Sequence, residues 1–284
     1  MGRCGHRAHC ARVQCVSRGK GGAGGGAGER EKVSRQSIGT ITGGGDTSTG
    51  AKRTSARIPV DYKRQREIYD PQEKPASVTI IGAGNIGSHS ALALARMGIA
   101  RITVYDDDIV EVHNLSSQAY RVGDVHKKKV DALAEMIAEI APQCTVIAVP
   151  EKYNGAPTDT IVISAVDSLD TRREIADMLK TRSVYVIDGR MGGGQVEVYA
   201  QRAHSWRKTI PAVGDDDPCG ARYISYTSYM IAGVIANTVK RHIMGEIDIA
   251  RLLLHTNTYQ IITERHAKTG NTKGAVTMAT RGGV

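Results

Sequence analysis

The chain has 284 residues, of which 40% are hydrophobic and 24% charged, so its composition is that of a globular protein with one large or two small domains. Its net charge of +9 is concentrated in residues 1–57, where eleven Lys and Arg stand against three Asp and Glu, so that this segment carries +8. The remainder is nearly neutral, and we expect no broad nucleic-acid-binding face on it.

Residues 1–57 contain fourteen glycines and almost no large apolar side chains. Such a segment cannot bury enough surface to offset its ordering entropy, so we predict a disordered, basic, Gly-rich tail over 1–57 and a folded domain over 58–284. The five cysteines show no close pairing pattern and no CxxC, which argues against a disulfide framework or a structural zinc site. No apolar run approaches the ~18 residues of a membrane helix, and we expect a cytoplasmic protein with no membrane partner.

From Ser77 onward, β-branched runs alternate with amphipathic stretches. The alternation predicts a Rossmann-like α/β fold, doubly wound, with a mostly parallel sheet and helices on both faces. A short polar helix at 61–71 is expected before it. The predicted strands are 77–81, 101–105, 144–149, 160–166, 183–188 and 195–200, which complete the expected set, and the predicted helices are 86–98, 126–142, 168–181 and 223–241.

The string GAGNIG at 82–87 lies directly between a predicted strand and a predicted helix. Gly82, Gly84 and Gly87 permit a tight turn and a close approach of the backbone, and the helix start offers free N–H groups to a phosphate. Asp106 lies ~20 residues further on, at the tip of the second strand, where an acid can accept hydrogen bonds from ribose hydroxyls. This context predicts a nucleotide site, with a purely structural tight turn as the alternative.

Two chemistries fit such a site: hydride transfer with a dinucleotide, or adenylyl transfer with ATP. In a dehydrogenase, the chain after the ribose-binding acid usually continues into the next strand-to-helix unit without a long polar segment. This chain instead continues with the long polar stretch DDDIVEVHNLSSQAYRVGDVHKKK at 106–129. The stretch favours ATP chemistry.

At this point the chain resembles the family of ThiF, MoeB and the ubiquitin-activating enzymes, over about residues 62–241. It shares the strand–GxGxxG–helix unit and an acid-x-acid-x-V-E-x-x-N-L-x-x-Q stretch. A lysine at a helix start, an A-V-D after a strand and an upstream Arg-Gln pair also match. The matching residues are Asp106, Asp108, Val110, Glu111, Asn114, Leu115 and Gln118, then Lys129, then Ala165, Val166 and Asp167, and upstream Arg64 and Gln65.

The resemblance implies an ATP-dependent adenylyltransferase. The C-terminal carboxylate of a small ubiquitin-like or sulfur-carrier protein would attack the α-phosphate, giving an acyl-adenylate and pyrophosphate. Charge spreads over the phosphate oxygens in the transition state, so cations aimed there dominate catalysis. Lys129 would neutralise the phosphates and Asp167 would hold Mg²⁺. Arg64 would reach in from the partner subunit of a homodimer, or would simply belong to an exposed basic helix.

The resemblance also implies the contacts to the nucleotide. Asp106 would bind the ribose, and Asn85 and Asn114 would line the phosphate path. The full set of expected nucleotide-binding residues is Gly82, Gly84, Asn85, Gly87, Asp106, Asp108, Asn114 and Gln118.

One position departs from the family. An Arg usually precedes the Gln of the N-L-x-x-Q stretch and contacts the phosphates, but this chain has Ser117 there. Arg121, Lys127 or Lys128 could supply the missing charge. Otherwise the chain would be a catalytically degenerate nucleotide-binding scaffold, and an NAD-dependent oxidoreductase is the rival enzyme.

Ordinary structural roles remain open for several of these residues. Asp167 could cap the helix that begins near Ser168, since Asp is a good capping residue. Lys129 could be a solvated charge at a helix start. Asp170 and Arg172 look like an exposed helical pair.

A thiol step is a further possibility. Many relatives pass the acyl group to a cysteine before a late helix, and Cys219 occupies a comparable place. A thiolate is needed for such an attack, while the alternative for Cys219 is a small buried residue at the helix entry. Cys144, inside a predicted strand, is expected in the core. The segment 191–195, MGGGQ, is a candidate wall for the channel that would receive the partner's tail.

Overall fold

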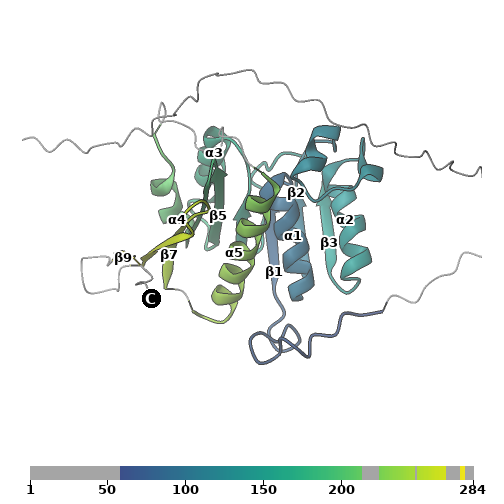
Figure 1. Ribbon diagram of the computed structural model, residues 1–284, viewed down its shortest axis with the longest axis horizontal. Helices are drawn as coiled ribbons and strands as arrows, with labels where there is room; N and C mark the ends of the chain where they lie inside the picture. The colour runs from purple at the N-terminus through teal and green to yellow at the C-terminus, as the bar shows by residue number, and fades with distance from the viewer. Residues whose placement is uncertain (1–57, 213–223, 247, 267–275, 279–284) are drawn as a thin grey trace, which may run out of the picture. The chain divides into compact units, whose positions relative to one another are not determined.

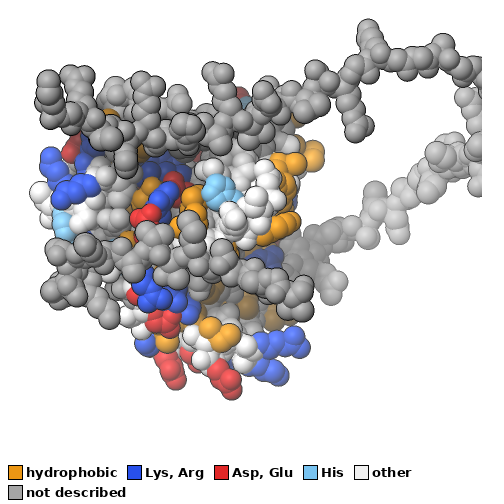
Figure 2. Space-filling model, turned by 60° about the vertical axis from the view of Figure 1, so that its left-hand side comes forward, with side chains coloured by type: hydrophobic (Ala, Val, Ile, Leu, Met, Phe, Trp, Pro, Cys, Tyr) orange, Lys and Arg blue, Asp and Glu red, His pale blue; other side chains and the backbone are white. Residues whose placement is uncertain are grey.

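The computed structural model describes residues 58–212, 224–246, 248–266 and 276–278. The predicted tail and Cys219 lie outside these ranges. The described residues build an α/β domain around one nine-stranded sheet (Figure 1). None of the helices in these ranges is both long and apolar enough to cross a bilayer. On the face shown in Figure 2, the described basic and acidic side chains are interspersed rather than gathered by sign.

Strands and helices alternate along the first part of the chain, and strands dominate the last part. The elements are β1 (Ser77–Ile81), α1 (Asn85–Met97), β2 (Arg101–Tyr105), the 3-10 turns η1 (Val112–Ser116) and η2 (Val122–Asp124), α2 (Lys129–Ile140), β3 (Thr145–Val149), β4 (Ile161–Ser164), α3 (Leu169–Leu179), β5 (Tyr185–Gly192), β6 (Gln195–Arg202), α4 (Ala203–Trp206), η3 (Arg207–Thr209), α5 (Ser225–Ile243), β7 (Ile249–His255), β8 (Gln260–Arg265) and β9 (Val276–Met278).

The sheet has the strand order β3-β2-β1-β4-β5-β6-β7-β8-β9. The pairs from β3 to β5 are all parallel, whereas those from β5 to β9 are all antiparallel. The chain moves outward from β1 to β3 and then returns to β4 on the other side of β1, which creates the switch point of a doubly wound sheet. The predicted Rossmann-like fold is confirmed. The expectation that 195–200 closes the strand set was wrong, because β7, β8 and β9 follow.

Helices cover both faces of the parallel strands, as predicted. Successive strand residues point to opposite faces. Val78 and Ile80 on β1 therefore join a core with α1, α2 and α5, whereas Ile81 joins a second core with α3 and Trp206 of α4. Figure 1 shows α1 lying alongside both α2 and α5.

The predicted helix at 61–71 was wrong, since this segment forms turns. Asp61 accepts a hydrogen bond from the Lys63 N–H at 2.9 Å, a local side-chain bond that competes with helix formation. The Gln65 side chain then donates to the Met97 carbonyl at 2.7 Å, at the carboxyl end of α1. The segment therefore serves to close the far end of α1.

Candidate functional site

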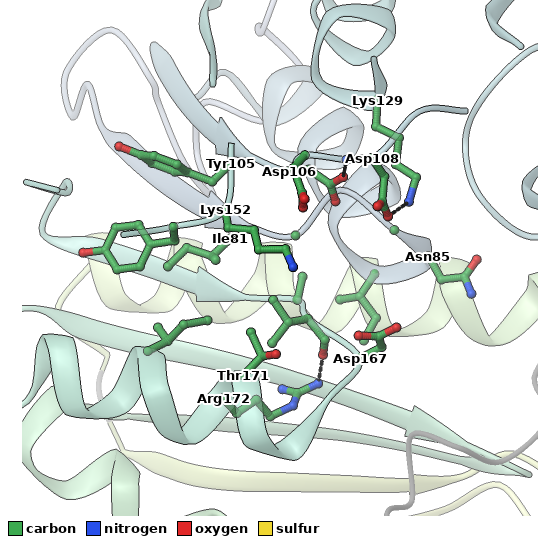
Figure 3. A pocket seen from close by; sticks show the side chains of 18 of the residues that line it. Ile81, Asn85, Tyr105, Asp106, Asp108, Lys129, Lys152, Asp167, Thr171 and Arg172 are labelled. Carbon is green, nitrogen blue, oxygen red and sulfur yellow. Dashed lines mark hydrogen bonds and ion pairs between the residues drawn. The ribbon is translucent and has the colours of Figure 1, made fainter. Parts of the chain in front are cut away.

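A cavity of about 580 Å³ opens at the carboxyl ends of the central parallel strands. Its wall includes Ile81 at the end of β1, Tyr105 at the end of β2 and the segment 165–167 after β4 (Figure 3). This is the switch point at which open α/β sheets bind ligands. The volume falls within the range of ~300–1,000 Å³ that is typical of small-molecule sites.

The glycine turn meets the cavity with its backbone. Gly82 has φ +97°, and an added Cβ would lie 2.7 Å from the Ala165 oxygen. At Gly87 an added Cβ would lie 1.8 Å from the Gly82 oxygen, so both glycines are required for the turn. Gly84 differs, because a Cβ there would meet nothing within 4 Å. It is the N-cap of α1 and makes no side-chain capping bond, which leaves the helix start open to an anion.

Asp106 ties the tip of β2 to this turn. One carboxylate oxygen accepts the Ala83 N–H at 2.6 Å, and the other accepts the Asp108 N–H at 3.0 Å. Burial raises the pKa of Asp106, although these hydrogen bonds and the nearby Lys129 act in the opposite direction. Asp106 thus lies where the ribose of a bound nucleotide is expected.

The polar stretch 106–129 folds back on itself and delivers Lys129 to the cavity. The Val110 N–H donates to the Lys127 oxygen at 2.8 Å, and the Lys129 N–H donates to the Asp108 oxygen at 3.0 Å. Lys129 opens α2 with its side chain only 8% exposed, and its Nζ lies 2.7 Å from an Asp108 carboxylate oxygen. It is a buried, paired cation on the cavity wall rather than a solvated one.

Hydrogen bonds also hold the middle of this stretch against the glycine turn and α1. The Tyr120 hydroxyl donates to the Ala83 oxygen at 2.7 Å. The Ala119 N–H donates to the Ser88 hydroxyl at 3.1 Å. The neighbouring Gln118 is thereby brought onto the cavity wall.

Two amide side chains on the wall lack partners. The Asn85 Oδ1 and the Gln118 Oε1 are both buried, with no hydrogen bond among the described residues. A buried polar atom without a partner costs about 1–3 kcal/mol. Because both residues line the cavity, a ligand with hydroxyl or amino groups could donate hydrogen bonds to these oxygens.

Asn114 does not line the cavity with these two. Its side-chain oxygen accepts the Glu111 N–H at 2.9 Å and caps η1 in the interior. Ser117 also lies outside the cavity lining, and its carbonyl oxygen lies 2.9 Å from His89 Nε2. Burial lowers the pKa of His89, although the hydrogen bond to the Ser117 oxygen acts in the opposite direction.

Asp167 faces the cavity from the turn after β4 (Figure 3). The capping alternative for it is wrong, because Ser168 is the N-cap of α3 and its hydroxyl accepts the Thr171 N–H at 3.4 Å. Within the described ranges Asp167 forms no hydrogen bond or ion pair. The cavity therefore brings together Gly84, Lys129 and Asp167, as the nucleotide interpretation requires.

The expected exposed pair of Asp170 and Arg172 was wrong. Arg172 is fully buried and bonds the Asp188 carboxylate, the Val166 oxygen and, at 3.0 Å, the Gly189 oxygen. Asp170 pairs instead with Arg173, three residues on, because side chains at that spacing are neighbours along a helix. Arg172 thus holds the peptide that precedes Asp167.

None of the residues expected to replace the missing family arginine lines the cavity. Arg121 binds Asp124 and Glu139, Lys127 binds Asp124 and Glu135, and Lys128 donates to the Asp107 oxygen.

Lys152, which the sequence analysis missed, does line the cavity, from the loop between β3 and β4 (Figure 3). It belongs to no motif, so no sequence signal marked it.

Arg64 lies elsewhere, exposed in the turn segment beside the far end of α1, and does not line the cavity of its own chain. Its role in a partner subunit stays a prediction. Met191 of the expected channel segment does line the cavity. Cys144 is buried, as expected, and burial raises the pKa of its thiol to about 11. The described part of the chain contains no group of three or more His, Cys, Asp or Glu suited to a metal.

Known proteins are similar to this chain in sequence or in fold. The chain is 30% identical over 155 residues to the tRNA threonylcarbamoyladenosine dehydratase of Escherichia coli K12, covering 52% of this chain and 56% of that protein. It is 32% identical over 139 residues to the adenylyltransferase and sulfurtransferase MOCS3-1 of Zea mays, covering 44% and 28%. The crystal structure of E. coli MccB with ATP superposes with a TM-score of 0.56 at 17% identity, covering 69% of this chain and 65% of that one.

The chain spans less than two thirds of the length of the curated relatives it matches. The ThiF family itself matches residues 66–275, well over half of the chain. Together with the Rossmann-like fold, this match establishes that the chain belongs to the ThiF family.

Proposed function

We propose that this chain is an ATP-dependent adenylyltransferase. A carboxylate attacks the α-phosphate of ATP, the bond to the β,γ-pyrophosphate breaks, and the products are an acyl-adenylate and pyrophosphate. The observation that carries the proposal is the convergence of Gly84, Lys129 and Asp167 on one cavity at the switch point of the sheet.

We propose that different residues of the cavity contact different parts of the nucleotide. The open start of α1 at Gly84 offers backbone N–H groups to the phosphates. Lys129 supplies positive charge where the phosphate oxygens gain charge in the transition state. Asp106 holds the ribose, and the unpartnered oxygens of Asn85 and Gln118 point to further polar contacts with the ligand.

Mg²⁺ fits the same wall. Magnesium usually keeps several waters and binds through one or two carboxylates together with substrate phosphates. Asp167 is such a carboxylate, without a partner in the described residues and facing the cavity. When bound, the ion would neutralise phosphate charge, and Asp167 is the residue that would hold it.

The carboxylate that we propose as substrate is the C-terminus of a small ubiquitin-like or sulfur-carrier protein. The name of the Zea mays relative, adenylyltransferase and sulfurtransferase, supports this class. Met191 on the cavity wall supports entry of a peptide tail along the segment 191–195. We also propose a homodimer in which Arg64 serves the partner's site, since its own cavity lies at the other end of α1.

A modified tRNA nucleoside is the second candidate substrate. The E. coli relative is named for threonylcarbamoyladenosine, a nucleoside that carries a threonine carboxylate. The +8 charge of residues 1–57 would favour an RNA partner, although the rest of the chain is nearly neutral. Both candidates share the same first step, which is adenylation of a carboxylate.

ATP–pyrophosphate exchange on the full chain tests the proposal. Exchange is measured with a carrier protein ending in Gly-Gly and, separately, with tRNA bearing threonylcarbamoyladenosine. We expect exchange with one of them, a loss of ~100-fold or more in Asp167→Ala, and wild-type exchange in Asp177→Ala. Asp177 is a matched control because its carboxylate lies on the exposed face of α3 beside Lys180.

Other outcomes of these measurements would support one of the two alternative functions. ATP binding without exchange on either substrate would favour a nucleotide-binding scaffold. Binding of reduced nicotinamide together with tolerance of Lys129→Ala would favour an oxidoreductase, since a hydride transfer has no need of that cation.

A further inference from the structure

The wall of the cavity carries more negative than positive side chains. A triphosphate entering it would meet this excess, so each cation that is free to face the ligand has a large effect on binding. Among the described residues the lining carboxylates are Asp106, Asp107, Asp108, Asp167 and Glu174, and the lining cations are Lys129, Lys152 and Arg172.

Two of these three cations are already engaged by carboxylates. Lys129 pairs with Asp108 at 2.7 Å. Arg172 is buried beneath the wall, where it pairs with Asp188 on β5. Their charge is therefore partly offset before any ligand arrives.

Lys152 differs from both. In the ranges that the structure covers, it makes no ion pair or hydrogen bond. Its side chain is exposed, and Figure 3 shows the ammonium group extending into the cavity from the side of Asp106. It is the cavity-lining cation without a carboxylate partner.

The backbone that carries Lys152 is fixed in place. The adjacent Tyr153 is only 7% exposed, and its hydroxyl donates to the Ala156 oxygen at 2.8 Å. Its ring packs edge-on against Tyr105 with the ring centroids 5.2 Å apart. Since Tyr105 immediately precedes Asp106, this packing anchors Lys152 beside the tip of β2, while its own side chain stays free to reach the ligand.

We infer that Lys152, in the loop between β3 and β4, is a phosphate-binding residue of this cavity. It supplies the positive charge that an arginine provides in the family and that Ser117 cannot provide here. The inference rests on the proposed nucleotide site. The other candidates for this charge, Arg121, Lys127 and Lys128, bind elsewhere. A lysine suits this role because it is a compact point charge on a flexible stem.

Calorimetric titration of the full chain with Mg-ATP and with adenosine separates a phosphate contact from a base or ribose contact. We expect Lys152→Ala to weaken ATP binding by ~10-fold or more and adenosine binding by less than ~2-fold, because adenosine has no phosphate for the ammonium group to bind. Lys152→Arg should keep most of the ATP affinity. Lys180→Ala, which removes an exposed lysine outside the cavity, is the matched control.

Equal losses for ATP and adenosine would overturn the inference, and so would an unchanged ATP affinity in Lys152→Ala. Both of these results leave the proposed function standing, because the wild-type chain still binds ATP. If the wild-type chain binds neither ligand, the proposed function and the inference both fail. Far-ultraviolet circular dichroism of each variant shows that the fold is kept, as expected for an exposed side chain.

Discussion

The two halves of the sheet differ in how firmly their residues are held. In the parallel half, from β3 to β5, nearly every residue of β1 and β4 is buried between helices. In the antiparallel half, from β6 to β9, every residue of β7 is only half-buried, and half of β8 is exposed. In the described ranges all lining residues of the cavity precede β6. The proposed nucleotide site therefore lies at the ends of deeply buried strands, as accurate positioning of a ligand requires.

Two glycines give the strongest test of this difference. An added Cβ at Gly87 would overlap the Gly82 oxygen, whereas at Gly193, in the β5–β6 turn, it would meet nothing within 4 Å. We expect Gly87→Ala to cost more than ~4 kcal/mol in the free energy of unfolding. Gly193→Ala should cost only about 1–2 kcal/mol, from its φ of +59°. Urea denaturation measures both, and similar losses would remove the distinction between the halves.

Two carboxylates that bind arginine give the next test. Asp188 is fully buried and accepts bonds from Arg172, from Arg190 at 2.7 Å and from the Trp206 indole at 3.0 Å. Asp188→Asn leaves these guanidinium groups buried without a full countercharge, and we expect a loss of about 3–5 kcal/mol. Urea unfolding midpoints measure this loss.

The control for Asp188 lies on the antiparallel half. Glu197 accepts from Arg251 at 2.5 Å, with side chains that are 17% and 28% exposed. Glu197→Gln should cost about 1 kcal/mol or less, because solvent reaches this pair. A larger loss at Glu197 than at Asp188 would contradict the picture of a tightly held parallel half.

The smallest expected effect is on the pH dependence of ATP binding, which tests whether the charge of Asp106 contributes to the affinity. Burial raises the pKa of Asp106 above its ordinary 3.8, and we propose that its ionised form accepts hydrogen bonds from the ribose hydroxyls. As the pH falls, ATP affinity should therefore begin to drop at a higher pH than an ordinary aspartate would allow. Asp106→Asn should bind ATP about tenfold more weakly at neutral pH, with no such drop. Calorimetry between pH 4 and 8 measures this, and parallel profiles for the two proteins would exclude Asp106.

The raised pKa of Asp106 also makes the stability of the fold depend on pH in a defined direction. Since the folded-state pKa is raised, the contribution of Asp106 to stability is fully present below pH 3.8 and is lost as the pH rises through the raised value. The Asp106→Asn variant has no titratable carboxyl group at this position, so it does not lose stability in this way. The variant should therefore gain stability relative to the wild type as the pH increases toward neutrality, and thermal unfolding at several pH values measures the difference.

The parallel half could be predicted closely because its signals are local. The β-branched runs at 77–81 and 101–105 match β1 and β2 residue for residue. The carboxyl ends of parallel strands meet at one edge, so Asp106 and Asp167 could be expected near the glycine turn before any coordinates were known. The prediction worked where a strand end alone fixes a residue's position.

In the antiparallel half, the local sequence signals for strands and turns are weaker. The strands β7 and β8 are joined by Thr256–Tyr259, a turn without glycine in which Tyr259 adopts a φ of +54°. Glycine normally takes the left-handed position of such a turn, whereas here a tyrosine takes it and Asn257 lies two residues before it. Lys152 escaped prediction for another reason, because its place depends on the packing of Tyr153 on Tyr105, a contact between distant parts of the chain.

The bonds that hold the stretch 106–129 against the glycine turn have a thermodynamic consequence. Tyr120 is joined to Ala83, and Ala119 to Ser88, by hydrogen bonds between groups of the protein itself. A nucleotide would therefore meet this stretch already in place, and little conformational entropy would be lost in ordering residues 106–129 around it. The contribution of this stretch to the affinity should then come from its contacts with the nucleotide rather than from its own ordering.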